Sequence, residues 1–267
     1  MKKGTSSIES GILTDAARMA RFDRLCDQAI RERHVMGEAG IGTMQEKRMH
    51  AVIKRFLCED ASFHEVGLAD TRYVSDVRIG DLAYEVQTGA FYPMRRKIDH
   101  YLEATDCTVT VVHPIPRIKW SCHIDATTHE VTPRRKVAGG RPLDVLPELY
   151  CLLPHLGNPR LRVHLLLLEV QDFRLTDFAR KGRRGSSRRY ERVPLSLVGE
   201  MELYSPEDFR VFLPEDLPQP FTVKQFSEQT KLRGRDAYSA VRVLAALGLL
   251  APADPIGRSM AFRVVEK

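Results

Sequence analysis

Two acidic side chains in the segment "SDVRIGDLAYEVQTG", residues 75–89, have the spacing of a paired carboxylate site. An aspartate comes early in this segment and a glutamate comes late, and between them Gly80-Asp81 is a typical turn pair. The runs on either side, 73–79 and 82–87, have the composition of extended strands. A hairpin of this kind would bring the two acids next to each other on neighbouring strands.

Asp76 and Glu85 are the two acids, and their chemistry depends on which face of the sheet they occupy. If they share a face, their carboxylates can hold a divalent metal ion, Mg²⁺ or Mn²⁺, and the backbone carbonyl of Val86 could be a third oxygen ligand. Such an ion polarises a phosphate group and lowers the pKa of a bound water. The alternative is a pair of solvated acids on the open face of the sheet, because a buried charge without a partner is costly.

The elements predicted around this hairpin follow the order α-β-β-β-α-β. A helix with one apolar stripe is predicted over 44–57, and a strand over 62–68 precedes the hairpin. After it, a helix begins at residues 91–93 with a proline near its first turn, and a buried strand follows over 107–115. A strongly apolar strand over 161–170 is expected to be the last of the sheet. The fold class is therefore α/β.

This order, together with the E-x-Q letters that end the second hairpin strand, resembles the PD-(D/E)XK nuclease superfamily. The stretches "YEVQTG" and "RRKIDHYL" look like its CoiA-like branch, and the resemblance covers about residues 44–115. It implies a restriction-endonuclease-like core that cuts DNA with Mg²⁺ or Mn²⁺. The metal ligands would be Asp76, Glu85 and the carbonyl of Val86, and Glu46 would be an accessory acid.

Gln87 is a departure from that family, because it stands where the superfamily usually has a lysine. A glutamine can orient a water but cannot stabilise charge as an ammonium does. Either a cation comes from elsewhere, or the chain is a catalytically inactive DNA-binding or regulatory protein. Lys97, on the helix after the motif, is the best candidate for that cation, and Arg95 and Arg96 beside it could bind phosphate. The alternative for these three is a solvated basic helix face.

Glu46 also has two interpretations. Thr43 and Glu46 fit a capping box, in which the glutamate only caps the start of the helix. Glu46 also shares a helical face with Met49 and Ile53, which would point it towards the sheet. We expect His50, one turn further on, to pack or form a hydrogen bond rather than act as a catalyst.

The C-terminal segment is predicted to form a small module with the order of a winged helix. Residues 216–221 indicate a linker, and Thr222 with Gln225 is a capping box that opens a short helix. A longer helix over 235–247 stops at Gly248, and two strands follow. The alternative is a helical protein-interaction module of the same shape.

Basic side chains recur at the places where this organisation would meet nucleic acid. Lys231, Arg233 and Arg235 cluster at the start of the second helix of the module, where a recognition helix contacts DNA. The loop 179–192 is dense in charge and could clamp a nucleic-acid backbone or simply be solvated. The net charge of +6 favours an anionic partner. The candidate clamp residues are Arg183, Arg184, Arg188 and Arg189.

We therefore expect three parts: an N-terminal helical extension over 1–39, a nuclease-like domain over 40–213, and a winged helix-turn-helix domain over 220–267. The first part contains a helix, about 14–33, that either packs on its own core or supports a homodimer. The five cysteines are scattered without a CxxC pair, which suits a reducing cytoplasm. Neither a membrane-length apolar run nor a signal peptide is expected. Endonucleolytic and exonucleolytic cutting both remain open, and so does RNA as the substrate in place of DNA.

Overall fold

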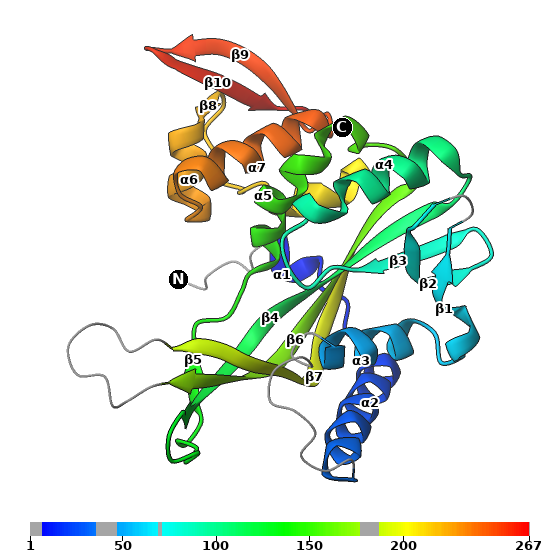
Figure 1. Cartoon of the computed structure of the whole chain (residues 1–267). Coiled ribbons are helices and arrows are strands. Elements are labelled where there is room, and N and C mark those ends of the chain that lie inside the picture. Colours follow the sequence, from blue (N-terminus) through cyan, green and yellow to red (C-terminus); the bar gives the residue numbers. More distant parts are fainter. Residues whose placement is uncertain (1–6, 36–46, 69–70, 177–186, 267) are drawn as a thin grey trace.

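The computed structural model describes residues 7–35, 47–68, 71–176 and 187–266, and helices cover both faces of its large twisted sheet (Figure 1). This sheet is mixed, and it confirms the α/β class. Its strands are β1 (His64–Gly67), β2 (Val74–Ile79), β3 (Leu82–Val86), β4 (Thr108–Asp125), β5 (Arg135–Val137), β6 (Leu161–Thr176) and β7 (Arg188–Leu203).

The strand order is β1-β2-β3-β4-β6-β7, and β5 pairs with β4. Strands β3, β4 and β6 are parallel to one another, whereas the flanking strands are antiparallel. Parallel strands are usually buried on both faces, and here adjacent residues belong to opposite cores. Val111 packs into the core on one face and Val112 into the core on the other, and Leu165 and Leu166 repeat the pattern on β6. Near-continuous apolar strands follow from this double burial.

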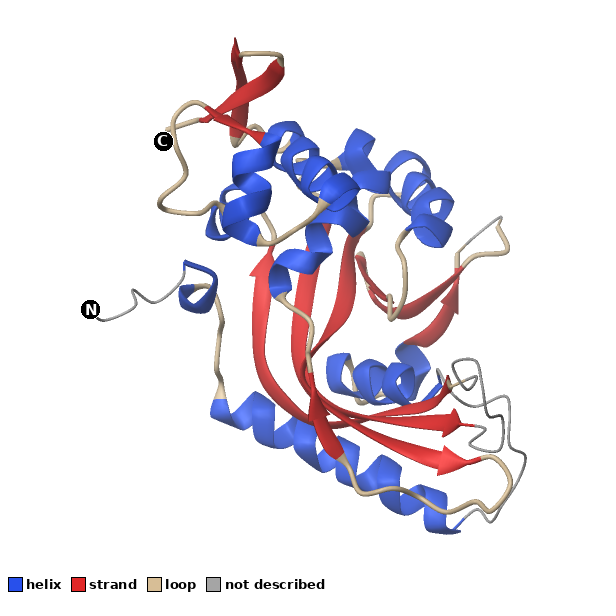
Figure 2. Cartoon of the chain, turned by 90° about the vertical axis from the view of Figure 1, so that its left-hand side faces the viewer, coloured by secondary structure: helices blue, strands red, loops and turns tan. Residues whose placement is uncertain are grey.

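Two groups of helices lie on the two faces of the sheet (Figures 1 and 2). One face carries α2 (Ala16–Val35) and α3 (Lys47–Leu57), and the other carries α4 (Arg95–Ala104) and α5 (Val145–Leu149). Within the described part of the chain, no helix is long and apolar enough to span a bilayer. The shorter helical pieces are α1 (Ser7–Ser10), η1 (Ala61–Phe63), η2 (Tyr92–Met94), η3 (Pro142–Asp144), η4 (Tyr150–His155) and η5 (Pro206–Phe212).

Helix α2 packs on the sheet of its own chain. Phe22 and Cys26 are fully buried in the core beneath α3, and the Phe22 ring meets the edge of the Phe56 ring at 5.1 Å between centroids. At its start Arg18 binds Glu200 of β7, with Nε 2.6 Å from the carboxylate. Of the two roles expected for this helix, packing on its own core is therefore what the structure supports.

Strand β7 corrects two expectations, because the sheet does not end at β6 and residues 188–192 are not part of a loop. The first half of β7 does not look apolar because it is rich in charged residues, two of which pair with other elements. Arg192 binds Asp172 of β6 at 2.6 Å, and Glu191 binds Arg48 of α3 at 2.7 Å. A strand whose charged residues pair with distant segments lacks the apolar pattern by which a strand is recognised in a sequence.

The C-terminal elements are β8 (Phe221–Thr222), α6 (Val223–Thr230), α7 (Gly234–Ala246), β9 (Leu250–Ile256) and β10 (Ser259–Val264). The capping box of Thr222 and Gln225 is confirmed, and Gly248 after α7 has a φ of +77°. The expected linker is instead partly structural, because Leu217 is 6% exposed and Phe221 is fully buried.

One hydrophobic core joins these C-terminal elements to the sheet. Phe226 and Val241 of this segment belong to the same buried cluster as Leu146 and Leu149 of α5. Arg141 strengthens the junction, since its guanidinium donates to the Thr230 carbonyl at 2.6 Å. The C-terminal elements are thus packed onto the rest of the molecule, and the β9–β10 hairpin projects from it (Figure 2).

Candidate active site

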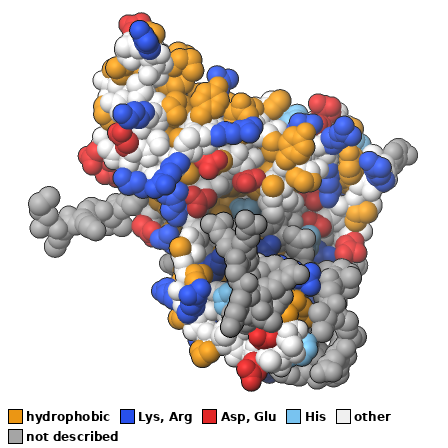
Figure 3. Space-filling view, turned by 60° about the vertical axis from the view of Figure 1, so that its left-hand side comes forward, with side chains coloured by type: hydrophobic (Ala, Val, Ile, Leu, Met, Phe, Trp, Pro, Cys, Tyr) orange, Lys and Arg blue, Asp and Glu red, His pale blue; other side chains and the backbone are white. Residues whose placement is uncertain are grey.

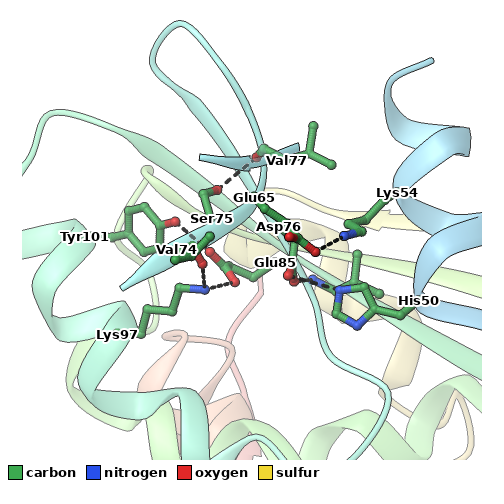
Figure 4. Close-up of polar contacts among 11 residues, drawn as sticks. His50, Lys54, Glu65, Val74, Ser75, Asp76, Val77, Glu85, Lys97 and Tyr101 are labelled. Carbon is green, nitrogen blue, oxygen red and sulfur yellow. Dashed lines mark hydrogen bonds and ion pairs between the residues drawn. The ribbon is translucent and has the colours of Figure 1, made fainter. Parts of the chain in front are cut away.

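The two hairpin acids lie where strands β2 and β3 stop pairing. The ladder runs from Ile79 opposite Leu82 to Val77 opposite Tyr84, so Asp76 and Glu85 are the first residues beyond it. There the Val86 amide donates to Oδ2 of Asp76 at 2.7 Å. Both carboxylates therefore lie at the opening of the hairpin, between α3 and α4 (Figure 4).

Glu85 is held through both of its carboxylate oxygens by helix α4. The Tyr101 hydroxyl donates to Oε1 at 2.6 Å, and the Lys97 ammonium binds Oε2 and also donates to the Val74 carbonyl at 2.6 Å. The residue is only 4% exposed, so the interpretation of a solvated acid is wrong for Glu85. Sequence reasoning missed Tyr101 as a site residue, although it lies four positions after Lys97 on the same helical face.

Burial, opposed by Lys97 and reinforced by the nearby Asp76 carboxylate, raises the pKa of Glu85 to about 7. The pKa of Asp76 is shifted in the opposite direction. Burial alone would raise its pKa, but hydrogen bonds from His50 and from the Val86 amide hold that pKa below its ordinary value. His50 Nε2 lies 3.0 Å from Oδ1 of Asp76, in keeping with the hydrogen-bonding role expected for this histidine. Two neighbouring carboxylates whose pKa values move apart are typical of sites that handle protons or cations.

A third acid, Glu65 of β1, lies close enough to repel Asp76, and sequence reasoning did not identify it. Its carboxylate is bound by Lys54 of α3 at 2.8 Å. Its backbone has a φ of +53°, which is uncommon for a residue with a side chain. No signal in the sequence separates this glutamate from an ordinary exposed one.

Gln87 does not point its amide freely at the acid pair. Its side-chain nitrogen donates to the carbonyl of Ala90, three residues later. Its backbone is fixed on both sides, because its amide donates to the Val112 carbonyl at 2.9 Å and its carbonyl accepts from His113 Nδ1 at 2.6 Å. The glutamine therefore closes the loop after β3, and Lys97 is the cation that contacts Glu85.

The acid pair suits a hard divalent cation by its chemistry. Asp76 lies near enough to Glu85 for its charge to raise the pKa of that residue, with Asp76 bound to His50 of α3 and Glu85 bound to Lys97 and Tyr101 of α4. Mg²⁺ is usually held by one or two carboxylates and keeps several of its waters, so a larger protein cage is not required. Among the residues that the structure describes, no group of three or more His, Cys, Asp or Glu side chains is placed to hold a metal ion. The residues present therefore fit a metal site with two carboxylate ligands. Glu46, the expected accessory acid, lies outside the described residues.

The candidate phosphate-binding residues near the hairpin have different surroundings. Arg95 lies over the ring of the exposed Tyr92, with its guanidinium carbon 4.8 Å from the ring centroid, and Arg96 is exposed. Arg188 and Arg189 are exposed at the start of β7. Arg183 and Arg184 lie outside the described residues.

At the C-terminal elements, basic side chains precede and follow the start of α7. Lys231 ends α6 with a φ of +62°, and its ammonium donates to the Glu228 carbonyl at 2.7 Å. Arg233 and Arg235 are exposed. Further along α7, sequence reasoning missed two exposed residues of the same helical face as Arg235, namely Tyr238 and Arg242. Figure 3 shows Lys and Arg side chains below the projecting hairpin, with Asp and Glu side chains among them.

One comparison with known proteins gives a match. A family model described as a domain of unknown function, DUF8091, matches residues 47–204, which include the sheet, the hairpin acids and helix α4. No curated protein and no solved structure gives a significant match.

Proposed function

The chain belongs to the DUF8091 family, and we propose that it is a metal-dependent nuclease that hydrolyses phosphodiester bonds in DNA. The observation that carries this proposal is the acid pair. Asp76 and Glu85 lie on neighbouring strands at the open end of a hairpin, one with a lowered pKa and the other with a pKa raised to about 7, and Lys97 contacts the second. Carboxylates beside a cation are the groups that phosphodiester hydrolysis needs.

The order of elements supports a restriction-endonuclease-like core. Helix α3 is followed by β1, β2 and β3, then by α4 and by β4, which pairs in parallel with β3. This is the α-β-β-β-α-β order of the PD-(D/E)XK resemblance, with the acids on the second and third strands. The domain over 40–213 in our proposal corresponds to this core.

In the proposed reaction, Asp76 and Glu85 would hold a divalent ion, Mg²⁺ or Mn²⁺, and the Val86 carbonyl would be a further oxygen ligand. The bound ion would polarise the phosphate and lower the pKa of water. Lys97 supplies the positive charge that Gln87 lacks, and its ammonium reaches the phosphate by leaving Oε2 of Glu85. His50 keeps Asp76 ionised and oriented through the contact of 3.0 Å. Arg95 and Arg96 neutralise flanking phosphates.

The C-terminal elements support DNA as the substrate. Helices α6 and α7 followed by the β9–β10 hairpin have the order of a winged helix, which corresponds to the domain proposed over 220–267. In the proposal, Arg233 and Arg235 meet the DNA together with the exposed face of α7. Lys231 lies beside them, and Arg188 and Arg189 extend the basic surface on β7.

A second candidate function is DNA binding without cutting. The observation in its favour is the Gln87 amide, which is bound to the Ala90 carbonyl and so does not contact the acids. In this alternative the acid pair and Lys97 are only a buried ion cluster. The two functions differ in one measurable property, the metal-dependent cutting of DNA.

The test is a nuclease assay on supercoiled, linear and branched DNA with Mg²⁺ or Mn²⁺. The wild type is compared with Glu85→Gln and with Glu103→Gln, a matched control that removes an exposed carboxylate from the same side of the hairpin, on α4. We expect cutting by the wild type and the control, and loss of cutting in Glu85→Gln. DNA binding without cutting by the wild type would refute the nuclease and favour the second candidate.

A further inference from the structure

Tyr101 and Lys97 hold the two oxygens of Glu85 in unequal ways. Tyr101 is fully buried in the main hydrophobic core, and its hydroxyl donates to Oε1 at 2.6 Å. Lys97 is a flexible side chain near the surface, 17% exposed, and its ammonium contacts Oε2. The first contact is fixed by packing, whereas the second is made by a side chain that reaches the surface and also donates to the Val74 carbonyl.

Ser75 of strand β2 lies beside Tyr101. It is fully buried and donates from its hydroxyl to the Val77 carbonyl at 3.0 Å, within hydrogen-bonding reach of the Tyr101 oxygen. The Tyr101 hydroxyl therefore lies among buried groups, and its hydrogen-bond acceptor is the Glu85 carboxylate.

We infer that Tyr101 is a positioning residue for the metal ion of the proposed nuclease, and that Lys97 competes with that ion for Glu85. Tyr101 fixes Oε1 and so presents Oε2 in one orientation, while the Lys97 ammonium occupies that oxygen when no divalent cation does. Hydrogen bonds to a ligating carboxylate orient it and strengthen metal binding. Two residues of one helix, four positions apart, would then affect the same carboxylate in opposite directions.

This inference rests on the proposed function and is tested with the metal alone, without DNA. Mn²⁺ is titrated into the full chain, and the free ion is followed by its electron paramagnetic resonance signal. We expect Tyr101→Phe to weaken Mn²⁺ binding about 10- to 100-fold, the range for lost outer-shell hydrogen bonds. We expect Lys97→Met to tighten binding about tenfold, because a neighbouring like charge is removed.

The matched control is Tyr204→Phe, which removes a tyrosine hydroxyl that is bonded to Glu202 just after β7, with strands β4 and β6 between it and the hairpin. It should leave Mn²⁺ affinity unchanged, and thermal unfolding should show that every variant is folded. Unchanged affinity in a folded Tyr101→Phe, or weaker binding in Lys97→Met, would overturn the inference while leaving the proposed function in place. If the wild type and Glu85→Gln both fail to bind Mn²⁺, the metal-dependent function itself is refuted and the inference with it.

Discussion

Replacing Glu200 by glutamine gives the strongest physical test of how helix α2 is held on the sheet. The Glu200 carboxylate is almost buried, with 7% of its side chain exposed, and it accepts from Arg18 at 2.6 and 2.8 Å. His164 Nε2 lies 2.8 Å from the same carboxylate. Burial alone would raise its pKa, but these two partners lower it from 4.5 to about 2.

The expected cost follows from that pKa. A carboxyl whose pKa is about 2.5 lower in the folded chain adds roughly 3 kcal/mol to the free energy of unfolding at pH 7. Because the folded pKa is the lower one, this stability is complete above pH 4.5 and is lost as the pH falls towards 2. At pH 3 a little under half of it should remain, on the order of 1.4 kcal/mol.

The assay is urea unfolding of the wild type and Glu200→Gln at pH 7, 5 and 3, followed by circular dichroism. Glu215→Gln is the matched control, because Glu215 is an exposed carboxylate beyond β7, and it should change stability by less than about 0.5 kcal/mol. A difference between Glu200→Gln and the wild type that does not shrink at low pH would refute the electrostatic argument. The loss would then come from packing alone.

Three further predictions concern the acid pair, the shared core and the exposed face of α7. At pH 8, the free energy of urea unfolding should be higher for Glu85→Gln than for the wild type, by up to about 3 kcal/mol. At pH 4 the two should be equally stable, because the raised pKa of Glu85 lowers the stability of the wild type as the pH climbs from 4.5 through 7. Phe226→Ala should lose about 3–5 kcal/mol, and calorimetry should show one transition for the whole chain because its ring lies in the joint core. Arg242→Ala should weaken DNA binding and reduce its slope against log salt by about one, measured by fluorescence anisotropy, whereas Tyr238→Phe should leave that slope unchanged.

Short-range patterns in the sequence were enough to predict the elements that carry the acids. Gly80-Asp81 specifies the turn between β2 and β3, and Gly80 has a φ of +60° that suits a residue without a side chain. The apolar stripes of α3 and α4 are buried as expected. Each of these features depends on residues within a few positions of one another, which is why periodicity and turn chemistry were sufficient.

Features that depend on distant partners could not be predicted in this way. Strand β7 begins with charged residues whose partners, such as Asp172, lie on other elements. Tyr101 looks like one more apolar position of α4 until its hydroxyl meets Glu85. Likewise, nothing near Gln87 in the sequence indicates that its amide binds the Ala90 carbonyl rather than the acids. Side-chain polar contacts of this kind are decided by the tertiary structure.

The joint core of α5 and α7 holds α7 at a fixed distance from the hairpin acids. With Val241 and Leu149 buried in one cluster and Arg141 bonded to the Thr230 carbonyl, little freedom is left for α7 to swing relative to the hairpin acids. On a duplex held by α7, the scissile phosphate would then stand at a constant number of base pairs from the contacted groove. If the chain cuts DNA as proposed, sequencing the cut ends of the wild type would show one number of base pairs between the contacted groove and the cut. Several such numbers would appear once the packing between α5 and α7 is loosened.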